Sequence, residues 1–297
     1  MYAIKRFSFI FGILFASVIY IFGQEENELV AELKTLYPDE NVVVLISEVI
    51  YTLEFDETNV PIAVIQTQEE QYISLQPSTY AVDVCFYDLY SEILKHKKNR
   101  EGFFDPNGFQ RCGNFEIDGI FYHDEQVCEY YLPFEEAGEQ QTVKTVKKFN
   151  DLKYFIEVPF SQNYPIVNRR VRLELPKSVD LEFIEMNLEY FNINRSEQTD
   201  SVSGLKVIEY NVLSMPMFNG IENLSGYSCS YPHLLAIFKG YEVSGEYIGL
   251  LGSTKDLFDL YSSFVSESEL SVELIEKTEQ LVQTAKTDTA KIAAIYY

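Results

Sequence analysis

The stretch Glu48-Val49-Ile50-Tyr51-Thr52-Leu53-Glu54-Phe55 indicates which class of fold the chain adopts. Every second residue in it is large and apolar, namely Val49, Tyr51, Leu53 and Phe55. A hydrophobic period of two is typical of a strand that buries one face. Asp56-Glu57-Thr58-Asn59 follows directly and is rich in turn-forming residues. The stretch therefore predicts a β-strand that ends in a turn.

Further predicted strands follow along the chain, separated by short polar turns. They are Ile62–Ile65, Tyr72–Leu75, Phe115–Tyr122, Gln126–Leu132, Thr142–Phe149, Leu152–Phe160, Val171–Leu175, Leu181–Phe191, Leu205–Leu213 and Leu234–Phe238. Thr79–Leu94 fits a strand or a helix, whereas Lys95–Gly113 and Asn194–Gly204 are predicted to be polar connections. The chain contains 22 Tyr and 22 Phe, which favour sheets. Without a strand–helix–strand rhythm, the series predicts a mainly β fold, an antiparallel β-sandwich over roughly residues 40–245.

The first residues have the composition of a targeting segment. Lys5 and Arg6 precede a predominantly apolar run from Phe7 to Phe22. This run is shorter than the ~20 residues that a membrane span needs, and it suits a secretory signal peptide. We expect cleavage after Gly23, with an uncleaved membrane anchor as the alternative. The expected location is therefore the periplasm or cell envelope of a Gram-negative bacterium.

The charge of the chain excludes one class of partner. Its formal net charge is −23, and acidic pairs such as Glu69-Glu70 and Glu135-Glu136 are spread along it. Nucleic-acid binding requires a basic surface that neutralises phosphates. We therefore expect no nucleic-acid partner, and membrane contact only through the signal or anchor.

Four cysteines, Cys85, Cys112, Cys128 and Cys229, would lie in an oxidising compartment after export. Four cysteines allow three complete pairings. Cys112 and Cys128 flank a predicted hairpin, so they are the favoured disulfide, and unpaired buried thiols are the alternative. The chain contains no Cys-x-x-Cys, and we expect no metal site.

The region from Glu246 to Tyr297 changes to helical spacing. Helices are predicted after Ser253, over about Val272–Thr284, and from Thr287-Asp288 onward. Ser253 and Thr287 are suitable N-caps. A shorter helix is predicted over Glu26–Tyr37, before the strands begin. The expected organisation is a signal peptide at 1–23, a β-sandwich domain at 24–245 and a helical segment at 246–297.

This C-terminal sequence resembles a junction in secreted bacterial transglutaminase-like proteins, where a β-sandwich domain of unknown function precedes a papain-like catalytic domain. The matching segments are Tyr247–Phe258, Ser262–Val265 and Thr287–Tyr297, with Tyr122-His123-Asp124, Val158-Pro159-Phe160 and Tyr231-Pro232-His233 at expected places upstream. By this resemblance, 246–297 is a linker followed by the first helix of a truncated catalytic domain. The family pattern continues with Trp-Val and then with catalytic Cys, His and Asp. The chain has no Trp, and none of its positions matches a catalytic one.

Other candidate sites are weakly supported by the sequence. The chain has three histidines, His96, His123 and His233. His123-Asp124-Glu125 suits a hairpin turn better than a metal site, and Cys229 with His233 is a poor nucleophile–base pair. Asp105-Pro106-Asn107-Gly108 lacks the acidic ligands of a calcium loop. We expect no catalytic residue, cofactor or metal ligand in this chain.

The sequence thus predicts a non-catalytic accessory or scaffold module of a secreted transglutaminase-like protein. Its expected partner is the missing C-terminal catalytic domain. One alternative is a free-standing module that binds an envelope protein or a glycan. Another is a hydrolase that uses a pair of carboxylates, although nothing selects two of the 46 acidic residues.

Overall fold

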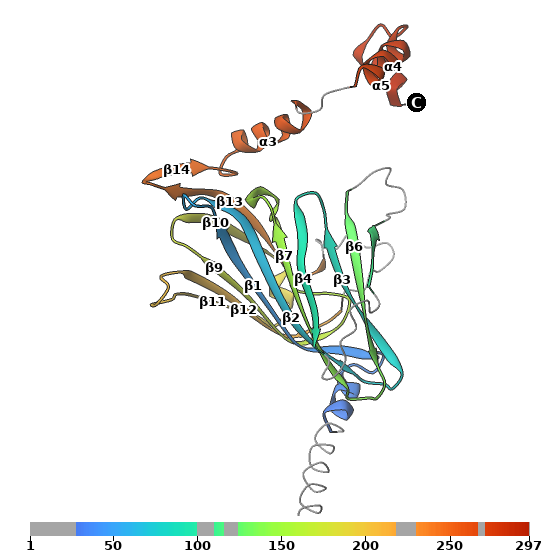
Figure 1. Ribbon diagram of the computed structural model, residues 1–297, viewed down its shortest axis with the longest axis vertical. Helices are drawn as coiled ribbons and strands as arrows, with labels where there is room; N and C mark the ends of the chain where they lie inside the picture. Colours follow the sequence, from blue (N-terminus) through green and yellow to red (C-terminus); the bar gives the residue numbers. More distant parts are fainter. Residues whose placement is uncertain (1–27, 100–109, 116–123, 218–229, 267–270, 297) are drawn as a thin grey trace, which may run out of the picture. The chain divides into compact units, whose positions relative to one another are not determined.

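A computed structural model describes residues 28–99, 110–115, 124–217, 230–266 and 271–296. The described part is mainly β, with antiparallel sheets and short C-terminal helices, as the sequence predicts (Figure 1). The chain divides into two compact units, one that ends at Ile248 and one over Gly249–Tyr297. No helix in the described ranges is long and apolar enough to cross a bilayer.

The largest sheet has seven strands in the order β11-β12-β9-β1-β2-β7-β4. All its neighbours are antiparallel except β1 and β9, which run parallel. In that order its strands are β11 (Ile193–Thr199), β12 (Lys206–Met215), β9 (Ile166–Leu175), β1 (Val42–Phe55), β2 (Pro61–Ser74), β7 (Gln140–Phe149) and β4 (Ser91–Asn99).

Two smaller sheets complete the β-rich unit. A four-stranded sheet contains β10 (Val179–Met186), β13 (His233–Val243), β14 (Glu246–Gly249) and β8 (Glu157–Pro159), which pairs with β13. A three-stranded sheet has the order β3-β6-β5 and contains β3 (Thr79–Tyr87), β6 (Gln126–Phe134) and β5 (Gln110–Asn114).

Both smaller sheets pack on the same face of the large sheet. Side chains alternate between the faces of a strand, so Ser47 and Tyr51 in β1 share one face. Ser47 hydrogen-bonds Glu70, whose cluster reaches Asp83 in β3. Tyr51 lies against Phe155, which also contacts Phe238 of β13. One end of β1 is therefore covered by the three-stranded sheet and the other end by the four-stranded sheet.

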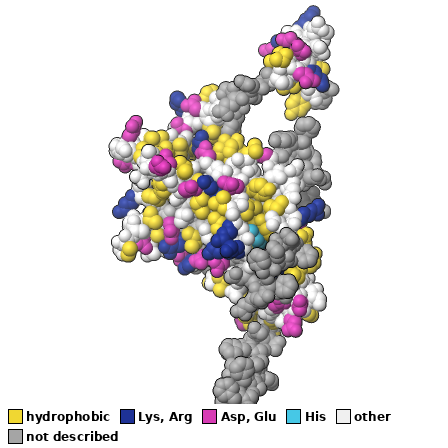
Figure 2. All heavy atoms as spheres, viewed as in Figure 1, with side chains coloured by type: hydrophobic (Ala, Val, Ile, Leu, Met, Phe, Trp, Pro, Cys, Tyr) yellow, Lys and Arg dark blue, Asp and Glu magenta, His cyan; other side chains and the backbone are white. Residues whose placement is uncertain are grey.

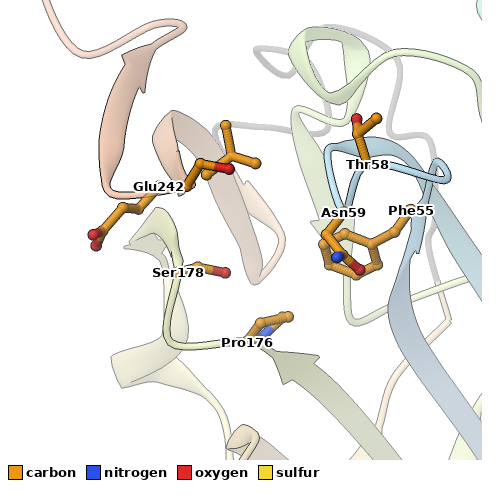
Figure 3. A pocket seen from close by; sticks show the side chains of 8 residues that line it. Phe55, Thr58, Asn59, Pro176, Ser178 and Glu242 are labelled. Carbon is orange, nitrogen blue, oxygen red and sulfur yellow. The ribbon is translucent and has the colours of Figure 1, made fainter.

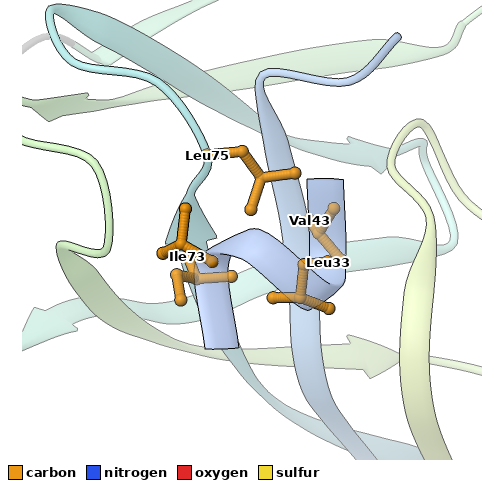
Figure 4. Close-up of a cluster of buried hydrophobic side chains, with 5 residues drawn as sticks. Leu33, Val43, Ile73 and Leu75 are labelled. Atoms are coloured by element: carbon orange, nitrogen blue, oxygen red, sulfur yellow. The ribbon is translucent and has the colours of Figure 1, made fainter. Parts of the chain in front are cut away.

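The opposite face of the large sheet is partly covered by the helical residues 28–36. Leu33 packs with Val43, Ile73 and Leu75 in a buried cluster that also includes Val30 (Figure 4). Val43 and Ile73 are register partners on β1 and β2. The predicted helix over Glu26–Tyr37 is thus present in the described residues and covers the start of β1 and the end of β2.

Several predicted element boundaries were wrong. Ile62–Ile65 and Tyr72–Ser74 belong to the single strand β2, which ends before Leu75, and Thr79–Leu94 contributes to the two strands β3 and β4. Lys95–Asn99 lies in β4 and Asn194–Thr199 lies in β11, rather than in polar connections. All residues of β11 after Ile193 are exposed, which suits a polar edge strand. Leu152–Phe160 contains a 3-10 turn, because the Asp151 carboxylate accepts a hydrogen bond from the Lys153 N–H at 2.9 Å.

The C-terminal unit contains the three predicted helices, α3 (Thr254–Ser266), α4 (Val272–Val282) and α5 (Asp288–Tyr296). Ser253 and Thr287 accept hydrogen bonds from the N–H groups of Asp256 and Ala290, as N-caps do. α4 and α5 contact each other, but neither contains a buried residue. These helices therefore present apolar side chains that their own unit does not cover.

Gly240 in β13 is closely packed against β14, and substitution of this glycine tests that packing. A Cβ atom there would overlap the Ile248 carbonyl oxygen and would lie 2.6 Å from the Tyr247 hydroxyl, both in β14. Gly240→Ala is therefore expected to displace β14 and to lower the free energy of unfolding by about 1–3 kcal/mol. Denaturant unfolding measures the loss. Gly249→Ala is the control, since a Cβ atom added there would meet nothing within 4 Å, and an equal loss in both variants would contradict the packing argument.

Candidate functional site

The most unusual chemistry in the described residues lies between the large sheet and the three-stranded sheet. There, polar and ionisable side chains occupy a region that is otherwise apolar core. We call this set the inter-sheet polar cluster, and its members are Ser47 of β1, Glu70 and Tyr72 of β2, Asp83 of β3, His96 of β4 and Arg169 of β9. Glu70 and Arg169 are only 2% and 3% exposed.

Hydrogen bonds connect the members of the cluster. The Tyr72 hydroxyl lies 2.7 Å from Glu70 Oε2 and 3.3 Å from Asp83 Oδ1, so it bridges the two carboxyl groups. Ser47 Oγ donates to Glu70 Oε1 at 2.8 Å. His96 Nε2 lies 2.9 Å from Asp83 Oδ2, and its ring stacks on Tyr130 of β6. Through Asp83 of β3, and through the stacking of His96 on Tyr130 of β6, the cluster therefore connects the large sheet to the three-stranded sheet.

The guanidinium group of Arg169, the cationic member of the cluster, is less completely hydrogen-bonded. Arg169 Nη1 lies 3.5 Å from Gln162 Oε1, and Gln162 Nε2 lies 3.5 Å from Glu70 Oε2. Within the described residues, Arg169 Nε is buried and has no hydrogen-bond partner. Arg169 thus acts on Glu70 mainly through its charge, across the Gln162 amide.

Burial changes the acid–base behaviour of the cluster. Burial is the main cause that raises the pKa of Glu70 above its ordinary value of 4.5, and the Asp83 charge raises it further, whereas Arg169 opposes the shift. Burial and the same two carboxylates place the Tyr72 pKa well above its ordinary value. The Glu70 carboxyl group therefore binds a proton more readily than an exposed glutamate does.

Such an arrangement resembles an acid–base pair, but the low solvent exposure of its side chains argues for another role. Asp83 is 7% exposed and Glu70 even less, so a substrate would have to separate two packed sheets to reach them. The cluster is instead suited to joining the sheets with an orientation that apolar contacts alone do not specify.

A separate cavity lies among loops at one edge of the β-rich unit. It has a volume of ≈ 350 Å³ and is lined by Phe55 at the end of β1, Thr58 and Asn59 in the turn that follows, Pro176 and Ser178 after β9, and Glu242, Val243 and Ser244 at the end of β13 (Figure 3). We call it the loop cavity. Its lining combines one aromatic ring, hydroxyl and amide groups, and the carboxylate of Glu242.

Local hydrogen bonds hold two walls of the loop cavity. Asp56 Oδ1 accepts hydrogen bonds from the N–H groups of Thr58 and Val60 at 2.8 and 2.9 Å. These bonds lower the Asp56 pKa. On the other wall, the Glu242 N–H donates to the Ser178 carbonyl at 2.7 Å. The loops are therefore fixed before any ligand arrives, which lowers the entropic cost of binding.

The sequence-predicted candidates occupy different places. His96 belongs to the inter-sheet polar cluster, and His233 is buried with Nδ1 2.9 Å from the Tyr231 carbonyl. Asp124 accepts a hydrogen bond from the Leu89 N–H at 3.3 Å, as a loop residue does. His123, Cys229 and Asp105–Gly108 lie outside the described residues. In the described part, no group of three or more His, Cys, Asp and Glu side chains is placed to hold a metal ion.

Cys112 and Cys128, the favoured pair, are joined by a disulfide between β5 and β6. Cys85 has a free thiol. Neither the bridge nor the thiol lines the loop cavity. The disulfide thus acts as a covalent tie for β5, whose residues are all exposed.

Charged side chains on the visible face of the β-rich unit are of both signs and are interspersed with apolar ones (Figure 2). Cross-strand ion pairs of the large sheet include Arg170–Glu48 and Lys148–Glu54. Exposed pairs of this kind contribute little stability. This face shows no continuous basic stripe of the kind that binds nucleic acid.

Comparison with known proteins gives a fold but no family. No family model matches the chain, and no curated protein matches it significantly. Among solved structures, a putative protease from Parabacteroides distasonis matches with a TM-score of 0.55 and 12% identity. The match covers 86% of this chain and 49% of that protein, so this chain spans about half of its length. At this identity, the likeness concerns the fold alone.

Two further matches are weaker. A putative nutrient binding protein from Legionella pneumophila has a TM-score of 0.35 at 10% identity, over 86% of this chain and 92% of that one. An M1 zinc metallopeptidase from Deinococcus radiodurans has a TM-score of 0.34 at 9% identity, over 67% and 42% of the two chains. Neither contributes to the argument that follows.

Proposed function

We propose that this chain is the non-catalytic accessory module of a secreted protein whose catalytic domain is transglutaminase-like. The module would be exported through its N-terminal signal, and the intact protein would perform thiol-based acyl chemistry on amide substrates. The main observation in support is the set of unburied apolar side chains on α4 and α5. The sequence resemblance of the same region names the domain that would cover them.

The physical argument concerns the cost of exposing these side chains. Ile292 and Ile295 of α5 are 63% and 51% exposed, and Val272 and Leu274 of α4 are 72% and 50% exposed. Burying one such side chain contributes about 1.5–3 kcal/mol. A helix as short as α5 is also marginal in isolation. A covering domain would stabilise both the helices and their apolar surface.

The comparison with the Parabacteroides protein is consistent with this proposal. That protein is named a putative protease, and its matched part is about half of it. Its remaining half leaves room for a catalytic domain beside a β-rich module of this fold.

The loop cavity supports a second candidate function, a free-standing module that binds a glycan or an envelope protein. An aromatic ring beside hydroxyl, amide and carboxylate groups suits a polar ligand with one apolar face. A carboxylate-based hydrolase is less well supported. Glu242 is the one acid among the eight residues that line the cavity, and the facing acids Glu70 and Asp83 are buried elsewhere.

The activity of the chain provides a direct test. We expect the chain that ends at Tyr297, after removal of the signal peptide at 1–23, to show no amidase or transglutaminase turnover. The coding sequence beyond Tyr297 is expected to continue in frame into Trp-Val and then into Cys, His and Asp motifs. The extended protein should be active, and replacement of the Cys in that extension should abolish its activity.

Two outcomes would contradict the proposal. A stop codon directly after Tyr297 would favour the free-standing binding module. Turnover by the unextended chain that is lost in Cys229→Ala would instead assign catalysis to Cys229 and His233.

A further inference from the structure

Three cysteines lie in one row across the three-stranded sheet. Cys128 of the central strand β6 is directly opposite Cys85 of β3 on one side and Cys112 of β5 on the other. Directly opposite residues in antiparallel strands place their side chains on the same face, with Cβ atoms about 4.5–5.5 Å apart. The three sulfur-bearing side chains are therefore consecutive neighbours along a line perpendicular to the strands.

The bond in this row is formed on one side of Cys128 only. The disulfide joins Cys128 to Cys112, and Cys85 keeps its thiol. Opposite residues on antiparallel strands have Cα atoms about 4.5 or 5.5 Å apart, and both distances fall within the range that a disulfide spans. Geometry thus permits Cys128 to pair with either neighbour.

We propose that the row is a site of internal thiol–disulfide exchange, in which the Cys85 thiolate attacks Cys128 Sγ and releases Cys112. One sulfur–sulfur bond forms between Cys85 and Cys128, and the bond between Cys128 and Cys112 breaks. The electron pair of the broken bond leaves on Cys112 Sγ, which takes up a proton equal to the one that Cys85 lost. No oxidant or reductant is consumed, because the number of disulfides is unchanged.

The arrangement of the row suits this reaction. A thiolate attacks a disulfide sulfur from the side opposite to the sulfur that leaves. Cys85 and Cys112 lie on opposite sides of Cys128 along the strand order β3-β6-β5. The attacking and leaving groups therefore occupy the positions that the reaction requires.

The groups around Cys85 make the exchange slow at neutral pH. Burial raises the Cys85 pKa most, the charges of Asp83 and Glu70 raise it further, and Thr145 and Lys147 of β7 oppose them. The other titratable groups at this position are Tyr130 on β6 and His96, which is bound to Asp83. Because the thiolate is the attacking species, the rate should increase about tenfold for each pH unit below the pKa of Cys85.

The exchange would change the surface of the molecule. Cys128 is buried, whereas Cys112 and the rest of β5 are exposed. Release of Cys112 would therefore present a thiol to solvent and remove the covalent tie between β5 and β6. An exposed thiol of this kind can attack a low-molecular-weight disulfide or a disulfide of another protein, which forms a mixed disulfide and releases one thiolate.

Alkylation of the native, oxidised chain separates exchange from simple thiol exposure. The chain is incubated with iodoacetamide at pH 7, 8 and 9, denatured with excess reagent present, and mapped by mass spectrometry without reduction. Exchange predicts that alkylated Cys112 accumulates together with a Cys85–Cys128 disulfide, about tenfold faster per pH unit. Molecules that have not exchanged are alkylated at Cys85 on denaturation and keep Cys112–Cys128 intact, so the absence of alkylated Cys112 at all three pH values is the result that would overturn the proposal.

Two variants assign the roles. Cys85→Ser should leave Cys112 bridged and unalkylated under every condition, and alkylation of Cys112 in this variant would show that another thiol attacks. Cys112→Ser should form the Cys85–Cys128 disulfide in a glutathione redox buffer. If both thiols of that variant remain free while its circular dichroism is native, the two side chains do not meet and the proposal is wrong.

Discussion

Replacement of Phe155 by Ala is expected to lower the free energy of unfolding by about 3–5 kcal/mol. Phe155 is 1% exposed, and its ring lies 5.1 Å from that of Tyr51, 5.2 Å from that of Phe149 and 6.2 Å from that of Phe238. These contacts join the large sheet to the four-stranded sheet. Truncation removes the transfer free energy of the ring and leaves a cavity between two sheets that cannot close without moving strands. Urea unfolding followed by far-ultraviolet circular dichroism measures the effect.

Tyr190→Ala is the matched control, since it also truncates an aromatic side chain in the β-rich unit. Tyr190 lies in a 3-10 turn and is 77% exposed. We expect Tyr190→Ala to change the free energy of unfolding by no more than about 0.5 kcal/mol, as most surface substitutions do. Similar losses in the two variants would mean that Phe155 does not join the sheets.

The strands that could be predicted from the sequence are those with one apolar face. Val49, Tyr51 and Leu53 alternate because one face of β1 is buried under the smaller sheets. The stretch Gln66–Gln71 gave no such signal, although it lies in the middle of β2. Its backbone is paired on both sides, by β1 and by β7, and this tertiary context outweighs its polar composition.

The inter-sheet polar cluster was missed for the same reason. Glu70 lies within that polar stretch, and its sequence neighbours are ordinary surface residues. Glu70 is unusual because Asp83 and His96, which lie on two other strands, belong to the same cluster. Such a convergence depends on the packing of one sheet on another, which no local pattern reports. The single available signal was weak: Tyr72 follows Glu70 at a spacing that places both side chains on one face of a strand.

Replacement of Glu70 by Ala is expected to cost about 3–5 kcal/mol, because it removes one partner from a buried charged network. Ser47 Oγ loses its acceptor, and the buried Arg169 loses the carboxyl group that it faces. Glu70→Gln keeps the shape and one carbonyl acceptor, so its loss should be much smaller. Denaturant unfolding of the three proteins at several pH values gives both differences. Equal losses for Ala and Gln would mean that the carboxylate charge, rather than the acceptor, is what the cluster requires.

The stability differences between wild type and the two Glu70 variants should depend on pH, and this dependence tests whether burial raises the Glu70 pKa. Because the pKa of Glu70 is raised in the folded protein, the folded state binds a proton more tightly than the unfolded state does. Its contribution to stability is therefore complete below the ordinary value of 4.5 and declines as the pH rises through the folded pKa. Neither Glu70→Gln nor Glu70→Ala can titrate at this position. The difference in unfolding free energy between wild type and each variant should therefore become smaller as the pH rises from 4.5 through the folded pKa of Glu70. A gap that widens with rising pH would show that Arg169 holds Glu70 ionised and that burial is the weaker effect.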